Sequence, residues 1–92
     1  MARGLHDRLL NASRVDWFAV LIDLNRKGLH TAGIADLIRA PRSTVLGWKQ
    51  GAEPCHADGE ALVELWCRMT ERERGDLPKV RVLEEMRRGF MG

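Results

Sequence analysis

The sequence predicts an all-α fold: a compact domain of four to five helices that contains a helix-turn-helix, over residues 1–76, and a C-terminal tail over 77–92. Apolar residues recur at spacings of three and four along several stretches, which is the period of a helix. Glycine and proline separate these stretches, at Gly28, Gly51, Pro54 and Pro78. The chain has 92 residues, 45% of them hydrophobic, which is the size and composition of one small domain.

The first predicted core helix lies between Ser13 and Gly28. Its apolar residues at helical spacing are Val15, Phe18, Leu21, Ile22 and Leu24. Ser13 followed by Asp16 resembles a capping box, and Gly28 is a suitable C-terminal stop. The helix is strongly apolar, so we expect it at the centre of the core, with Trp17 and Phe18 buried.

Two short helices joined by a tight turn are predicted over residues 34–51. The first has an apolar stripe that consists of Ile34, Ala35, Leu37 and Ile38. The next three residues, Arg39-Ala40-Pro41, are poorly suited to a helix interior. Helical spacing then resumes at Arg42 and stops at Gly51, a suitable C-terminal residue.

The second helix of this motif has an apolar face and a polar, basic face. Val45 and Trp48, three residues apart, can both face the core. The opposite side carries Ser43, Gly47 and Gln50, with Arg42, Leu46 and Lys49 along one edge. Hydroxyl, amide and guanidinium groups on one outward face suit the DNA major groove. The alternative is an ordinary helical hairpin whose basic residues are solvated.

The segment resembles the helix-turn-helix of the phage-repressor/Cro family. The shared pattern is Ile-Ala-x-Leu-Ile, a turn, then Arg-Ser-Thr-Val-x-x-Trp-x-x-Gly, and it covers about a fifth of the chain. The family usually has glycine where this chain has Arg39, and a serine or threonine where it has Pro41. A non-glycine residue at positive φ costs roughly 1 kcal/mol, so either Arg39 adopts that conformation or the turn differs. Proline suits the first turn of a helix.

The motif and the resemblance imply a sequence-specific double-stranded DNA-binding transcriptional regulator of phage or bacterial type. Thr31 is placed to cap the first motif helix, where the family also tends to contact phosphate. We expect Arg42 to pair with a guanine or a phosphate, and Ser43 and Gln50 to read base edges. The candidate DNA-binding residues are Thr31, Arg39, Arg42, Ser43, Thr44, Leu46, Gly47, Lys49 and Gln50. Two alternatives remain: a helical protein–protein interaction module, and a phage packaging or replication component that uses the same motif.

The positive charge is concentrated on the motif. The chain has a net charge of +2, but residues 26–51 hold five basic residues against one acidic residue, which gives +4. Residues 52–76 hold seven acidic residues and three arginines, which gives −4, and residues 77–92 carry +2. Because phosphate contacts dominate DNA affinity, the motif is where positive charge is needed.

Beyond the motif, Asp58 is predicted to cap a further helix. The expected inner face of that helix consists of Ala61, Leu62, Leu65, Trp66 and Met69. Gly75 and Pro78 interrupt the chain after it, and the tail can be a helix or a short strand. Its apolar residues are Leu77, Val80, Val82, Leu83, Met86, Phe90 and Met91. One recognition helix covers few base pairs, so we expect a homodimer on two half-sites, with the tail as the dimerisation element.

No pattern predicts catalysis, a cofactor, a metal or a small-molecule substrate. Cys55, His56 and Cys67 offer three ligand types but lack the second closely spaced pair of a structural zinc site. No nucleophile–base motif or glycine-rich phosphate loop occurs. The longest apolar run, residues 17–22, is far shorter than the roughly 20 residues of a membrane span. The N-terminus lacks a secretory signal, so we expect a cytoplasmic protein.

Overall fold

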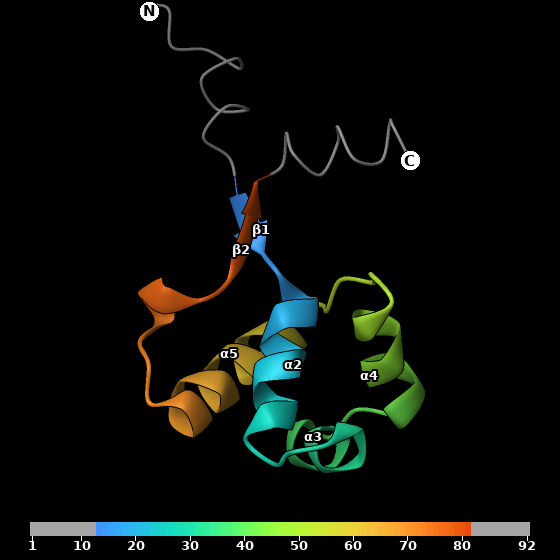
Figure 1. Ribbon diagram of the computed structural model, residues 1–92. Coiled ribbons are helices and arrows are strands. Elements are labelled where there is room, and N and C mark those ends of the chain that lie inside the picture. The colour runs from blue at the N-terminus through green and yellow to red at the C-terminus, as the bar shows by residue number, and fades with distance from the viewer. Residues whose placement is uncertain (1–12, 82–92) are drawn as a thin grey trace, which may run out of the picture. The chain divides into compact units, whose positions relative to one another are not determined.

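The computed structural model describes residues 13–81 and consists of two compact units (Figure 1). The helical unit contains α2 (Trp17–Arg26), α3 (Thr31–Ile38), α4 (Arg42–Lys49), α5 (His56–Thr70) and a 3₁₀ turn, η1 (Arg74–Asp76). The other unit contains a two-stranded antiparallel sheet of β1 (Ser13–Val15) and β2 (Lys79–Arg81). The prediction of an all-α domain with four to five helices is confirmed, and the start of the tail is a strand.

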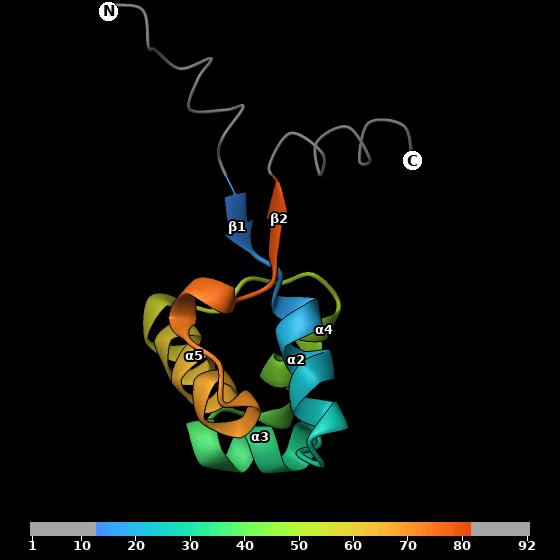
Figure 2. The same ribbon diagram turned by 60° about the vertical axis from the view of Figure 1, so that its left-hand side comes forward.

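Helix α2 lies between α4 and α5, and α3 packs against both α4 and α5 (Figures 1 and 2). The apolar core draws on all four helices and includes Val20, Leu21, Leu24, Ile34, Ala35, Val45, Trp48, Leu62, Val63 and Trp66. Trp66 is fully buried, and its indole Nε1 donates a hydrogen bond of 3.0 Å to the Asp23 carboxylate on α2. This bond ties α5 to α2 while it satisfies the one polar atom of a buried ring.

Helix α2 begins later than the sequence predicted. It starts at Trp17, because Ser13–Val15 is the strand β1, so the predicted capping box is wrong. The buried face of α2 follows the i, i+3, i+4, i+7 pattern from Trp17, which is half-buried, through Val20 and Leu21 to Leu24. Phe18 lies beside this face and is 54% exposed, so its assignment to the core is also wrong.

Each of the four helices ends at a residue in the left-handed conformation. These residues are Gly28 (φ 92°), Arg39 (φ 64°), Gly51 (φ 110°) and Glu71 (φ 57°). After α4, the Ala52 amide donates to the Gly47 carbonyl and the Gly51 amide donates to the Trp48 carbonyl. This pair of bonds is the Schellman arrangement, which satisfies the last carbonyls of a helix. Gly51 therefore ends the helix as predicted.

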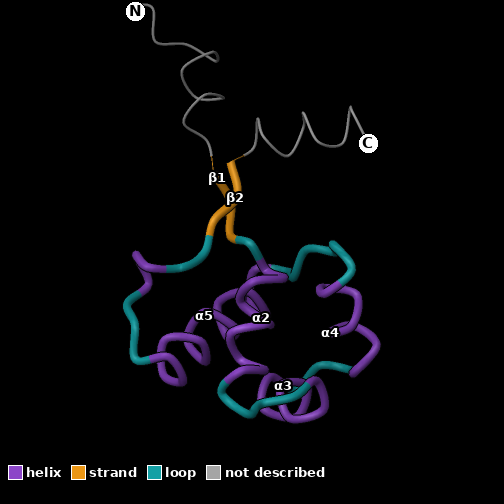
Figure 3. The backbone as a smooth tube through the Cα atoms, in the orientation of Figure 1, coloured by secondary structure: helices purple, strands orange, loops and turns teal. Residues whose placement is uncertain are grey.

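A three-residue turn, Arg39-Ala40-Pro41, joins α3 to α4 (Figure 3). Arg39 itself adopts the left-handed conformation, so the turn keeps the geometry for which glycine is the usual residue. The Ala40 amide donates to the Ala35 carbonyl, and the Pro41 carbonyl accepts from the amides of α4's first turn. Of the two alternatives for this turn, Arg39 therefore adopts the left-handed conformation itself.

Two predicted N-terminal caps are wrong. Helix α3 begins at Thr31, with His30 in the cap position and no side-chain cap bond. Helix α5 begins at His56, with Cys55 in the cap position, so Asp58 is the third helical residue and not the cap. The Asp58 carboxylate, in the first turn, still interacts favourably with the helix dipole.

The inner face of α5 was predicted in part. Leu62 and Trp66 are buried, but the other three expected residues, Ala61, Leu65 and Met69, are only half-buried. Val63 and Gly59 complete the buried face instead. At Gly59 the Trp17 ring lies 3.3 Å from where a Cβ atom would be, so the missing side chain lets the first residue of α2 pack closely on α5.

The first residues of the tail, 77–81, pack or pair with other residues of the same chain. Leu77 is 8% exposed, and β2 pairs with β1 in the register Arg14↔Val80 and Val15↔Lys79. Leu77 and Val80 thus have intramolecular partners. The other apolar tail residues, from Val82 onward, lie outside the described residues.

No helix in the described range 13–81 is long and apolar enough to cross a membrane.

Candidate nucleic-acid interface

Helix α4 is fixed by one face and open on the other. Val45 is fully buried and Trp48 is 3% exposed, which confirms that both belong to the core. Arg42, Ser43 and Gln50 are exposed, and so is Leu46. The predicted division of this helix is therefore correct for its core face and for the four exposed residues of its outward side.

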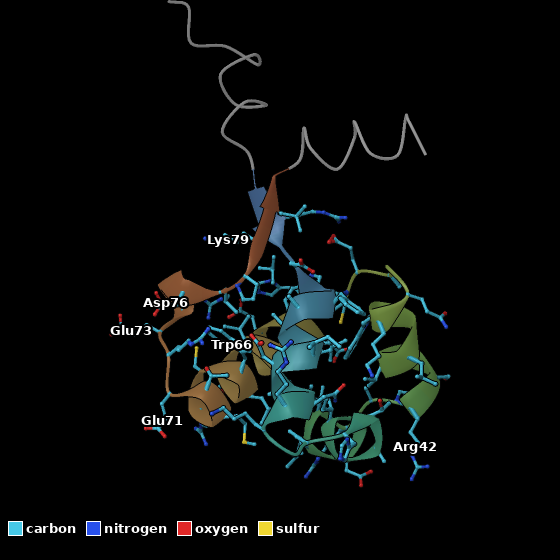
Figure 4. The ribbon with its side chains drawn as sticks, viewed as in Figure 1. Arg42, Trp66, Glu71, Glu73, Asp76 and Lys79 are labelled. Carbon is cyan, nitrogen blue, oxygen red and sulfur yellow. The ribbon has the colours of Figure 1, made fainter. Side chains whose placement is uncertain are left out.

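The polar groups on the outward face have no protein partners among the described residues. Arg42 extends away from the helical unit from the first turn of α4 (Figure 4). Within residues 13–81, neither the Ser43 hydroxyl nor the Gln50 side-chain amide makes a hydrogen bond. The helix also begins without a side-chain cap, so its first amide groups remain open to solvent or to an anion.

The cations of the motif differ from the arginines of α5 and η1 in their partners. Arg39, Arg42 and Lys49 form no ion pair within the described part of the chain. By contrast, Arg68 lies 2.8 Å from Glu64. A hydrogen bond from Arg74 to Glu60 likewise lowers the pKa of that carboxyl. The charge of the acidic segment is thus partly neutralised locally, whereas the charge on the motif is available to an external anion.

Four candidate residues are less open than the sequence suggested. Thr31 and Thr44 are half-buried, and Thr31 lies at the end of α3 opposite the turn. Gly47 is half-buried because the loop after α4 folds back over it, with the Ala52 Cβ 3.7 Å from where a Gly47 Cβ would be. Lys49 is also half-buried, which for a lysine is compatible with a buried stem and a solvated ammonium.

Two of the five cations counted with the motif belong elsewhere. Arg26 and Lys27, at the end of α2, line a hollow of about 300 Å³ together with Asp23, Thr70 and Arg72. The Arg72 guanidinium carbon lies 5.8 Å from the centre of the Trp66 ring, a cation–π contact. A charge count along the sequence could not separate these cations from those of the motif, because the separation arises from helix packing.

Sequence reasoning also missed a hollow between α3 and α5. Its volume is about 200 Å³, and Leu37, Ile38, Ala61, Glu64, Leu65 and Arg68 line it. Leu37 is 62% exposed, so this member of the apolar stripe does not share the buried face of α3 with Ile34 and Ala35. The position could have been flagged, because Leu37 lies about 100° from Ile38 on the helix and both cannot occupy the centre of one face.

Cys55 is exposed and Cys67 half-buried, and both are free thiols. Among the residues that the structure describes, no group of three or more His, Cys, Asp or Glu side chains is placed to hold a metal ion.

No protein-family model, curated protein or solved structure matches this chain. The case for a function therefore depends on the geometry and chemistry of α4 and its neighbours.

Proposed function

We propose that this protein is a sequence-specific double-stranded DNA-binding transcriptional regulator of phage or bacterial type, similar to the phage-repressor/Cro family. In this proposal α4 enters the major groove. One observation supports it most strongly: Val45 and Trp48 anchor α4 in the core, while the polar groups on its other face are exposed and unpaired. A rigidly held helix with free hydrogen-bond donors and acceptors is what direct readout of base edges requires.

The proposal gives the exposed residues separate roles. Arg42 pairs with guanine O6 and N7 or with a neighbouring phosphate, and Ser43 and Gln50 contact base edges. Arg39 and Lys49 flank this face and neutralise phosphates. Thr31, Thr44 and Gly47, which are half-buried, lie at the margin of the interface. No catalytic activity, cofactor or small-molecule substrate is part of the proposal.

The proposal includes a homodimer in the cytoplasm. A helix of eight residues, Arg42–Lys49, can reach only a few base pairs, and two copies related by a two-fold axis would read two half-sites one helical turn apart. In this proposal the C-terminal tail, residues 77–92, is the dimerisation element, and residues 79–81 of it also pair with β1.

The experiment that tests the proposal is selection from a random duplex library, followed by affinity measurement at two salt concentrations. We expect one enriched sequence that binds at least a hundredfold more tightly than a scrambled duplex, with affinity falling as salt rises. Arg42→Ala should reduce this preference. Arg68→Ala is the matched control, because Arg68 is also exposed but pairs with Glu64 on α5. Absence of any enrichment, with no affinity for DNA at low salt, would reject the proposal.

A second candidate function is a protein–protein interaction module, and the hollow beside Leu37 favours it. A leucine that is 62% exposed next to a hollow partly lined by apolar side chains is a feature of docking surfaces, and DNA readout does not need it. Leu37→Ser separates the two functions. DNA binding through α4 should survive this substitution, whereas binding of a protein in the hollow should not.

A further inference from the structure

Leu46 is an apolar side chain surrounded by polar and charged residues on the outward side of α4. In a helix, the nearest surface neighbours of a residue are those three and four positions away. For Leu46 these are Arg42, Ser43, Lys49 and Gln50, all four of them polar or charged. Leu46 is nevertheless 46% exposed, so the core does not account for it. An exposed leucine alone needs no explanation, but one that is surrounded by the proposed base-reading groups does.

The major groove offers one apolar group to such a side chain. Base edges there present hydrogen-bond donors and acceptors, except for the 5-methyl group of thymine. A leucine placed against a polar base edge would desolvate it without giving a hydrogen bond, which is unfavourable. Placed against a methyl group, the same side chain buries apolar surface on both partners.

We propose that Leu46 is a specificity-determining residue that reads the 5-methyl group of a thymine near the centre of each half-site. The inference rests on the proposed function, since it assumes that α4 enters the groove. Val45 and Trp48 fix the rotation of α4, so Leu46 cannot turn inward without removing one of them from the core. The polar neighbours then contact the base pairs and phosphates on either side of this thymine.

The test uses the duplex that the selection enriches and replaces its thymines one at a time by deoxyuridine, which removes only the methyl group. In each half-site we expect a single thymine whose replacement, on its own, weakens wild-type binding about fourfold. This factor is the equivalent of one buried methyl group. Leu46→Ala should bind the thymine and deoxyuridine duplexes equally well. Leu37→Ala is the matched control, because Leu37 is an exposed leucine on α3 and its removal should leave the fourfold preference intact.

The outcomes separate this inference from the proposed function. Sequence-specific binding with no effect of any deoxyuridine replacement would overturn the role of Leu46 and leave the proposed function standing. A preference that persists in Leu46→Ala would also overturn it. Failure to enrich any sequence would reject the proposed function and this inference together. The wild-type comparison alone decides the first outcome, so the test does not depend on how well the variant folds.

Discussion

Arg39 occupies a backbone conformation that glycine adopts more readily. Its φ of 64° places it in the left-handed region, which costs a side chain with a Cβ atom about 1 kcal/mol or more. The guanidinium of Arg39 is exposed and unpaired within residues 13–81. Under the proposed function, the turn keeps an unfavourable residue because its charge neutralises a phosphate.

Arg39→Gly should therefore raise stability and lower DNA affinity. We expect the free energy of unfolding to increase by about 1 kcal/mol, measured by chemical denaturation. We also expect the salt dependence of DNA binding to become shallower by about one unit. Glu71→Gly is the control, since Glu71 is left-handed too but lies after α5, and it should raise stability alone. A loss of stability in Arg39→Gly would show that the turn needs the arginine side chain.

Arg42 and Lys49 should differ in the kind of binding that each supports. Arg42 points outward from the first turn of α4, so Arg42→Ala should cost about 1–3 kcal/mol on the selected sequence and relax its specificity. Lys49→Ala should weaken binding to all duplexes by a similar factor. Titration of both variants against selected and scrambled duplexes measures the difference. Unchanged affinity of Arg42→Ala for the selected duplex would remove Arg42 from the interface.

The four helices were predictable because their apolar residues repeat locally, and Val45 and Trp48 are the clearest example. The starts of α3 and α5 were not, because neither has a side-chain cap to signal it. The strand Ser13–Val15 was also missed, since its partner lies more than sixty residues away and no local pattern records that pairing. Periodicity identified which helices have an apolar face but not how far that face is covered, so Phe18 was wrongly assigned to the core and the exposure of Leu37 was not predicted.

The orientation of α4 can be tested through its buried anchor. Trp48 is 3% exposed, so Trp48→Ala should leave a cavity and lower the free energy of unfolding by about 3–5 kcal/mol. Thermal melting, monitored by circular dichroism, measures this loss. The control is Leu46→Ala on the other face, which should change stability far less. A small effect of Trp48→Ala on melting would mean that the tryptophan is not the anchor.

At the scale of the molecule, the basic residues around α4 differ from those after it in whether they form ion pairs. The net charge of +2 does not reveal this difference. The cations around α4 are unpaired in the described structure, whereas two arginines after it pair with glutamates. Eight of the nine predicted site residues lie in α4 or within three residues of it, because the motif is a local sequence pattern. The position of Arg26 and Lys27 away from this motif was not predictable, because it follows from the packing of α2 on α5.

The dimer prediction concerns the tail, residues 77–92. Leu77 is buried in its own chain and β2 pairs with β1, so the test removes only residues 82–92. We expect the full chain to sediment as a dimer at tens of micromolar, and a chain that ends at Arg81 to sediment as a monomer. Truncation at Arg81 keeps Leu77 and both strands, so the comparison isolates the contribution of the last eleven residues. A monomer in both cases would mean that any dimer forms only on DNA.

The central claim is that DNA binds the outward face of α4, and the most direct test maps the interface on the folded protein. Backbone amide shifts are recorded by nuclear magnetic resonance while a duplex of the selected sequence is added. The account predicts the largest changes over residues 39–50. It predicts little change at Arg26, Lys27 and Arg72 or around Leu37. Changes centred on either of those two surfaces, with α4 unaffected, would contradict it.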